Sequence, residues 1–323
     1  MRGRALLGVI AAVFAAFSWS LNFVAPYVLG PYSIYDLAVC RFLMSGLMGL
    51  VILYVLRKTA PQLGLLDWFV AGWLGFVGYV GYFLTIMGAV LFAGPIVPPA
   101  FVALVPVVLA LTSNRGKHAI PWTALMFPIA LTFTGLLLVN ANAFMQTARL
   151  SGSTAIGIGF SVGAIGLWTH FAMANRAALA KRPQINAWKW TAAMMVAGSV
   201  EILAFVPFGY YFHLLNLPQV GFSWALFAPI FYASAALAAI GSIGGSWAWT
   251  MASKRLPIGL AGQLIVTETI FATSFGLMAH HRWPTWQEIS GVTLLVIGVV
   301  SALRAFYGCL QHETVQLLTS MQD

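Results

Sequence analysis

The sequence predicts an all-α integral membrane protein with ten transmembrane helices, arranged as two inverted five-helix repeats. Three observations carry this prediction: a very apolar composition, a one-sided distribution of positive charge, and a weak internal repeat. Of the 323 residues, 61% are apolar and only 7% are charged. Because a soluble globular domain carries roughly 25% charged residues, this composition excludes both an ordinary soluble protein and a disordered one.

Long uncharged runs, bounded by charges or by proline and glycine, mark the expected helices. A bilayer core about 30 Å thick requires about 20 apolar residues of helix, and lipid leaves helices or closed barrels as the only spanning structures. Ten runs qualify, at roughly 5–28, 33–56, 67–91, 94–113, 121–140, 153–178, 188–212, 223–252, 257–279 and 285–305. The first run is too long for a cleaved signal peptide, so we expect a retained helix.

The positive charges fall on one side of the membrane that these helices define. Thirteen of the sixteen Lys and Arg residues lie in the loops and ends of one side, Arg149 and Arg282 lie on the other, and Arg41 lies within the second span. Cytoplasmic loops collect Lys and Arg. We therefore expect an even number of spans, with both termini in the cytoplasm. The net charge of +9 then needs no nucleic-acid partner.

An internal repeat divides the chain into two halves of five spans. A shift of 163 residues superposes Gly78 and Gly81 on Gly241 and Gly244, Pro121 on Pro284, and Gly135 on Gly298, whereas the first helices need a shift of 149, which places Trp19 on Trp168. An odd number of spans per half inverts the second half, which is typical of transporters. We expect repeats at 1–148 and 149–306, followed by a cytoplasmic tail at 307–323.

Two short segments resemble a known family. The segment Asp36-Leu-Ala-Val-Cys-Arg41-Phe-Leu-Met-Ser-Gly is similar to the entry of the second helix in the drug/metabolite transporter superfamily, in its ten-helix, EamA-type branch. The segment Thr267-Glu268-Thr-Ile-Phe resembles that family's ninth helix, although Thr269 stands where proline is usual. The chain most resembles bacterial inner-membrane exporters of aromatic amino acids, which implies that it too lies in a bacterial inner membrane. This resemblance implies alternating access through a central cavity that helices one, three, four, six, eight and nine surround.

Ionisable residues inside the spans are candidates for function because they are costly in lipid. Glu268 either serves transport, by pairing with a substrate ammonium or by exchanging a proton, or makes a structural hydrogen bond, with Thr267, Thr269 or Arg41 as partners. Glu201 is the other possible partner of Arg41. We expect Arg41 to be structural, because arginine stays charged and must find either a carboxylate or several carbonyls. His170 is expected in tight helix packing, with substrate contact as the alternative.

Aromatic and polar residues that share helical faces suggest a binding cavity for flat substrates. Rings with a polar neighbour suit a planar aromatic group or a cation, although packing between helices is an equal alternative for each residue taken singly. The proposed substrate-binding set is Trp19, Asn22, Phe23, Tyr79, Tyr82, Phe83, Pro99, Trp168, His170, Ser246, Trp249, Gln263 and Glu268. In the first helix, Trp19, Asn22, Phe23 and Pro26 have the spacing of one α-helical face.

Proline and glycine suggest special backbone in the third, fourth and eighth helices. Pro98 and Pro99 either free backbone carbonyls for binding or kinking, or begin a helix after Gly94. Glycines at three-residue spacing in the third and eighth helices predict close helix packing.

Other functional classes find little support in the sequence. No metal-binding or catalytic motif is visible, so we expect no enzyme, no cofactor and no metal, and His280 and His281 are expected to be solvated loop residues. The expected partners are a small organic solute and the lipid bilayer, with a monomer or weak homo-oligomer as the assembly. A broader exporter of drugs, nucleosides or other metabolites is the alternative to an amino-acid exporter. Proton coupling and facilitated transport both stay open.

Overall fold

The computed structural model describes residues 2–94, 97–114, 121–141 and 152–319, and every regular element in these ranges is helical. Nine helices in them are long and apolar enough to cross a membrane. The chain is therefore an all-α, multi-pass membrane protein.

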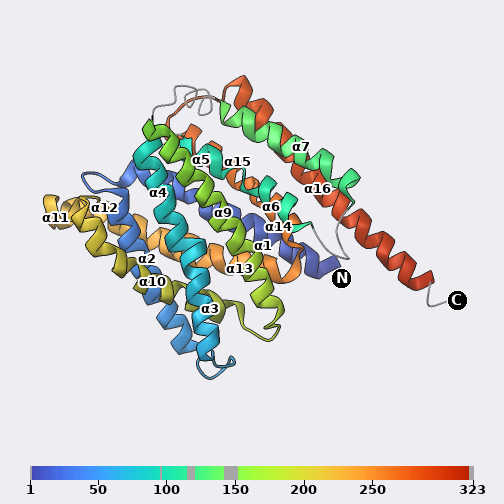
Figure 1. Cartoon of the computed structure of the whole chain (residues 1–323), viewed down its shortest axis with the longest axis horizontal. Coiled ribbons are helices and arrows are strands. Elements are labelled where there is room, and N and C mark those ends of the chain that lie inside the picture. The colour runs from blue at the N-terminus through green and yellow to red at the C-terminus, as the bar shows by residue number, and fades with distance from the viewer. Residues whose placement is uncertain (1, 95–96, 115–120, 142–151, 320–323) are drawn as a thin grey trace.

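The helices form one bundle, in which three short stretches depart from α-helical geometry (Figure 1). The labels η2 and η3 denote π-helices, and η1 denotes a 3-10 helix. In chain order the elements are α1 (Arg2–Ser20), η1 (Leu21–Val28), α2 (Ile34–Val55), α3 (Leu65–Gly75), η2 (Phe76–Val80), α4 (Gly81–Ala93), α5 (Val97–Val102), α6 (Val105–Ser113), α7 (Trp122–Val139), α9 (Gly152–Ala180), α10 (Ala187–Tyr211), α11 (Leu217–Val220), α12 (Trp224–Ala236), η3 (Leu237–Gly245), α13 (Ser246–Arg255), α14 (Ile258–Ile265), α15 (Thr267–Ala279) and α16 (Trp286–Thr319).

The nine long helices match nine of the ten predicted spans, whereas the span predicted at 94–113 differs. This segment contains only a shorter apolar helical stretch, Pro98–Ser113, which divides into α5 and α6. Pro98 and Pro99 stand in the first turn of α5, and Pro106 stands in the first turn of α6. Proline is tolerated there because first-turn N–H groups have no partner within the helix. These prolines therefore begin helices, which was one of the two alternatives.

The first helix tightens before its predicted end. The 3-10 helix η1 begins at Leu21 and includes Asn22 and Phe23. Three residues per turn replace 3.6 in this geometry. Asn22 still lies beside Trp19, to whose carbonyl its Nδ2 donates at 2.7 Å, but Phe23 is exposed, so the prediction that Phe23 shares their face is wrong.

Helices distant in sequence pack together along their lengths. The main pairs are α7 with α16, α2 with α10, α4 with α9, α1 with α13, and α6 with α14. Figure 1 shows α7 beside α16 on one flank of the bundle. Close approach depends on glycine: a Cβ on Gly78 would lie 2.3 Å from the Phe171 ring, and one on Gly135 would lie 2.8 Å from the Gly291 carbonyl oxygen.

At each end of the bundle, polar contacts join loops that are distant in the sequence. At one end, Lys189 Nζ donates to the Pro61 carbonyl at 2.7 Å, Lys254 Nζ donates to that of Ile185 at 2.8 Å, and Arg182 pairs with Asp67 at 2.5 Å. The connections after α2, α9 and α13 thus meet at this end. At the other end, Asp36 accepts hydrogen bonds from the backbone N–H groups of Asn216 and Leu217, at 3.0 and 3.2 Å. This second end joins the start of α2 to the segment after α10.

Candidate functional site

Three tryptophan rings meet inside the bundle. Trp19 of α1, Trp168 of α9 and Trp249 of α13 are all buried, and their ring centroids lie 5.9 Å (Trp19 to Trp168), 6.0 Å (Trp19 to Trp249) and 5.1 Å (Trp168 to Trp249) apart. These separations fall within the range of favourable aromatic contact. We call these three residues the tryptophan cluster.

Tyr79, on the π-helix η2, extends the tryptophan cluster. Its ring centroid lies 5.1 Å from that of Phe171, which in turn lies 6.3 Å from Trp168. The Tyr79 hydroxyl lies next to the Ser246 hydroxyl and near the Arg41 guanidinium. In the described part of the chain, the hydroxyls of Tyr79 and Ser246 and the indole nitrogen of Trp249 are buried and make no hydrogen bond of good geometry. Buried polar groups are normally paired, so these groups are available to bind another molecule or water.

The π-helix η3 fixes the position of Trp19. Trp19 Nε1 donates to the Gly241 carbonyl oxygen at 3.1 Å. A Cβ on Gly245 would lie 2.8 Å from the same Nε1 atom, so only glycine allows this approach. π-Helical turns are frequent at functional sites because they displace backbone groups from the regular ladder. Both π-helices of the described structure contribute to this site.

Arg41 is buried beside the tryptophan cluster with neutral partners. Its Nε donates to Ser242 Oγ at 2.9 Å, and its Nη1 donates to Asn22 Oδ1 at 2.5 Å. Neither Glu268 nor Glu201 pairs with it within the residues that the structure covers, so the predicted carboxylate partner is wrong. Glu201 faces Gly72 of α3 instead, with a carboxylate oxygen 4.0 Å from where a Gly72 Cβ would lie. The sequence does not reveal this because the partners of Arg41 come from η1 and η3.

Glu268 lies just after the break between α14 and α15. Its carboxylate interacts electrostatically with Tyr82 and makes no hydrogen bond or ion pair within the described ranges. The Thr267 hydroxyl donates to the Leu264 carbonyl at 2.7 Å, so it does not bind Glu268 as expected. Tyr79 and Tyr82 are three residues apart across the junction of η2 and α4. Glu268 and the tryptophan cluster therefore border the same stretch of helix.

Five other predicted site residues lie apart from this group. His170 is exposed and accepts a 3.4 Å contact from Trp73 Nε1, while Phe23 is also exposed. Phe83 packs on Phe42, with centroids 5.9 Å apart, Gln263 accepts from Thr132 Oγ1 at 3.1 Å, and Pro99 lies in α5. The expected tight packing around His170 is wrong, because a Cβ on the neighbouring Gly166 would meet no atom within 4 Å.

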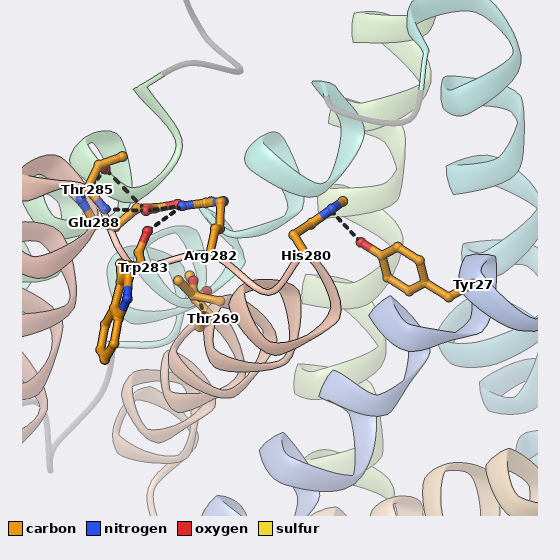
Figure 2. Close-up of polar contacts among 8 residues, drawn as sticks. Tyr27, Thr269, His280, Arg282, Trp283, Thr285 and Glu288 are labelled. Atoms are coloured by element: carbon orange, nitrogen blue, oxygen red, sulfur yellow. Dashed lines mark hydrogen bonds and ion pairs between the residues drawn. The ribbon is translucent and has the colours of Figure 1, made fainter.

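A hydrogen bond at the second end of the bundle links η1 to the end of α15. Tyr27 Oη, on η1, lies 2.8 Å from His280 Nε2, at the end of α15 (Figure 2). Beyond it, Arg282 forms a double ion pair with Glu288, with N···O distances of 2.8 and 2.6 Å. His280 is therefore a contact between two helices, and not simply the solvated loop residue that the sequence suggests.

A cavity of about 350 Å³ lies at the same end, between α2, α10 and the segment around α11. Its lining is almost entirely apolar, and its one acidic residue, Asp36, already accepts hydrogen bonds from Asn216 and Leu217. Cavity and tryptophan cluster share no residue. Among the described residues, no group of three His, Cys, Asp or Glu side chains could hold a metal ion.

Comparisons with known proteins agree with a membrane fold. No protein-family model matches the chain. The inner membrane protein YtfF of Escherichia coli (strain K12) is 29% identical over 311 residues, which cover 92% of this chain and 95% of that protein. A protein of known crystal structure is similar over 93% of this chain and 98% of its own, with a TM-score of 0.70 and 19% identity. The chain thus shares its fold with a solved structure and its sequence pattern with an inner membrane protein.

Proposed function

We propose that this chain is an inner-membrane exporter of amino acids, aromatic ones above all, and that it works by alternating access through a central site. In this proposal it has ten spans in two inverted EamA-type repeats, with both termini in the cytoplasm. The observation that carries the proposal is the tryptophan cluster with its unpaired hydroxyl and indole groups. Aromatic rings with free polar groups, buried in the middle of a helical bundle, suit a flat solute with charged ends.

Irregular backbone supports the repeat. The shift of 163 residues that aligns Gly78 with Gly241 also places η2 (Phe76–Val80) within η3 (Leu237–Gly245). The same shift places Val102, where α5 ends, on Ile265, where α14 ends. Two broken helices in corresponding positions are a feature of transporters built from inverted repeats.

The helix pairing supports it too. Exchanging each helix of one half for its counterpart in the other turns the pair α4 and α9 into the pair α13 and α1. The same exchange leaves the pairs α7 with α16 and α2 with α10 unchanged, because the two helices of each pair are counterparts. This pattern is what a two-fold axis in the membrane plane would generate.

Alternating access assigns roles to the two ends. The tryptophan cluster and Tyr79 are buried, so the site is closed to solvent in this conformation. Opening toward the outside requires η1 and α15 to separate, which breaks the hydrogen bond between Tyr27 and His280. In the proposed cycle, a solute enters from the cytoplasm, its ring packs on the tryptophan cluster, Glu268 meets its ammonium group, and the outer end then opens.

A flux panel in proteoliposomes tests the substrate class. Phenylalanine flux should be inhibited by unlabelled tyrosine and tryptophan, and far less by nucleosides or organic cations. Equal inhibition by all three classes would favour the broader exporter of drugs and metabolites. No flux of any amino acid would refute the proposal.

A double variant tests the site. Trp168→Ala combined with Tyr79→Ala removes two rings of the site and should abolish phenylalanine flux. Trp283→Ala combined with Tyr211→Ala removes two exposed rings and is the matched control. Unchanged flux in the first variant would count against the site.

A further inference from the structure

A buried positive charge in this site has no negative partner. Arg41 is 5% exposed, and the two acceptors of its hydrogen bonds, Ser242 Oγ and Asn22 Oδ1, are both uncharged. Arginine keeps its charge in proteins, and a buried charge is stable only when paired or fully hydrogen-bonded. The described structure therefore leaves Arg41 short of an anion.

The unpaired groups around Arg41 are all able to donate hydrogen bonds. A guanidinium has five N–H donors in a planar fork, and those of Nη2 make no hydrogen bond within the described ranges. The Tyr79 hydroxyl lies near this guanidinium and beside the Ser246 hydroxyl; both hydroxyls are buried, and neither makes a hydrogen bond of good geometry. A cation surrounded by spare donors is the chemistry of a carboxylate receptor, since a carboxylate only accepts and fits the guanidinium fork.

The receptor adjoins the tryptophan cluster through two short links. Ser242, which binds Arg41 Nε, directly follows Gly241, whose carbonyl binds Trp19 Nε1. Asn22, which binds Arg41 Nη1, also donates from Nδ2 to the Trp19 carbonyl at 2.7 Å. A ligand with a ring on the tryptophan cluster would thus hold its carboxylate a short distance away, at Arg41.

We infer that Arg41, with the Tyr79 and Ser246 hydroxyls, binds the carboxylate of a substrate whose aromatic ring packs on Trp19, Trp168 and Trp249. This inference rests on the proposed function and deepens it. It makes Arg41 a residue that contacts substrate, where the sequence predicts a structural role. It also defines the substrate class as aromatic compounds that carry a carboxylate on a short chain.

Binding to the purified full-length protein tests the inference without relying on transport. The probes are phenylalanine, phenethylamine, which lacks the carboxylate, and 3-phenylpropanoate, which lacks the ammonium group. Losing hydrogen bonds to a charged group corresponds to about a 10- to 100-fold loss of affinity. We expect phenethylamine to bind at least 10-fold more weakly than phenylalanine. Equal affinity of the two compounds for the wild-type protein would overturn the inference.

Arg41→Gln should remove this discrimination, so that phenylalanine and phenethylamine bind alike. Arg57→Gln is the matched control, because Arg57 is exposed and donates to the Tyr54 carbonyl at the opposite end of α2. Tyr79→Phe keeps the ring and removes one donor, so it should weaken phenylalanine and 3-phenylpropanoate but not phenethylamine. If Arg41→Gln does not fold, the Tyr79→Phe variant tests the inference in its place. If a folded Arg41→Gln variant still binds phenylalanine more tightly than phenethylamine, the inference is overturned. If Arg41→Gln does not fold, the inference is overturned when Tyr79→Phe prefers phenylalanine as strongly as the wild type does.

Two further outcomes separate this inference from the proposed function. If Arg41→Gln transports phenylalanine and still prefers phenylalanine to phenethylamine, export is supported and the carboxylate receptor at Arg41 is refuted. Absence of phenylalanine flux, together with 3-phenylpropanoate binding that depends on Arg41, would refute amino-acid export and keep a receptor for aromatic carboxylates. Chloride that displaces 3-phenylpropanoate at similar concentration would show an inorganic-anion site and overturn the inference.

Discussion

Alanine in place of Gly78 should destabilise the protein and impair its site, because the added methyl group has no room. The new Cβ would lie 2.3 Å from Phe171 Cδ2 and 2.4 Å from Phe171 Cγ. Carbon atoms in contact are normally about 3.5–4.0 Å apart, so η2 and α9 must separate by about 1 Å. The Phe171 ring is fully buried.

The expected cost follows from overpacking in a filled core. One inserted methyl group of this kind costs about 1–3 kcal/mol of unfolding free energy. Phe171 lies between Tyr79 and Trp168, so the same displacement moves both walls of the site. A misplacement of about 1 Å in a binding site can lower a rate by about 100-fold. We therefore expect phenylalanine flux to fall more steeply than stability.

Gly166→Ala is the matched control for this substitution. Gly166 lies in α9, the helix that Gly78 packs against, but a Cβ on Gly166 would meet no atom within 4 Å. Alanine in a helix interior is favoured over glycine by about 1 kcal/mol, so this variant should be as stable as the wild type or more so. The assays are chemical unfolding in detergent micelles and flux in proteoliposomes. Wild-type stability and flux for Gly78→Ala would refute the packing argument.

Three further substitutions test other parts of the structure. Asp36→Asn should lower the unfolding free energy by about 1.5–3 kcal/mol. The two carboxylate oxygens accept bonds from Ser33, Asn216 and Leu217, whereas an amide has only one oxygen. Chemical unfolding in micelles measures this free energy, and an unchanged midpoint would contradict the prediction. Tyr27→Phe should release η1 from α15 and lengthen the spin-label distance between their outer ends, whereas His281→Ala should leave that distance unchanged. Glu268→Gln should abolish the pH dependence of flux if this carboxylate exchanges a proton; intact flux with intact pH dependence would exclude proton coupling through it.

Hydropathy predicted the spans well because a membrane helix must satisfy its own backbone and face lipid. The segment Ile34–Val55 was predicted at 33–56, and Ala187–Tyr211 at 188–212. The start of α5 at its prolines was one of the alternatives that the sequence left open, since proline suits a first helical turn. The shift of 163 residues places η2 within η3, but the sequence letters do not predict a π-helix at either position.

Side-chain partners were predicted less well because they depend on geometry between helices. An α-helical wheel placed Phe23 with Trp19, but the 3-10 turn beginning at Leu21 moves it to the exposed side. Charge pairing suggested a carboxylate for Arg41, whereas two neutral side chains from η1 and η3 surround it.

The sequence by itself determined that the chain is a multi-pass helical membrane protein, since its apolar runs leave few other structures open to it. Only the tertiary structure decided which of the residues proposed from the sequence lie together. Trp19, Trp168 and Trp249 lie far apart along the chain, and the approach of α1, α9 and α13 brings them together. It also placed the Arg41 charge among neutral donors and acceptors, because a contact between distant segments depends on packing and has no local signature in sequence.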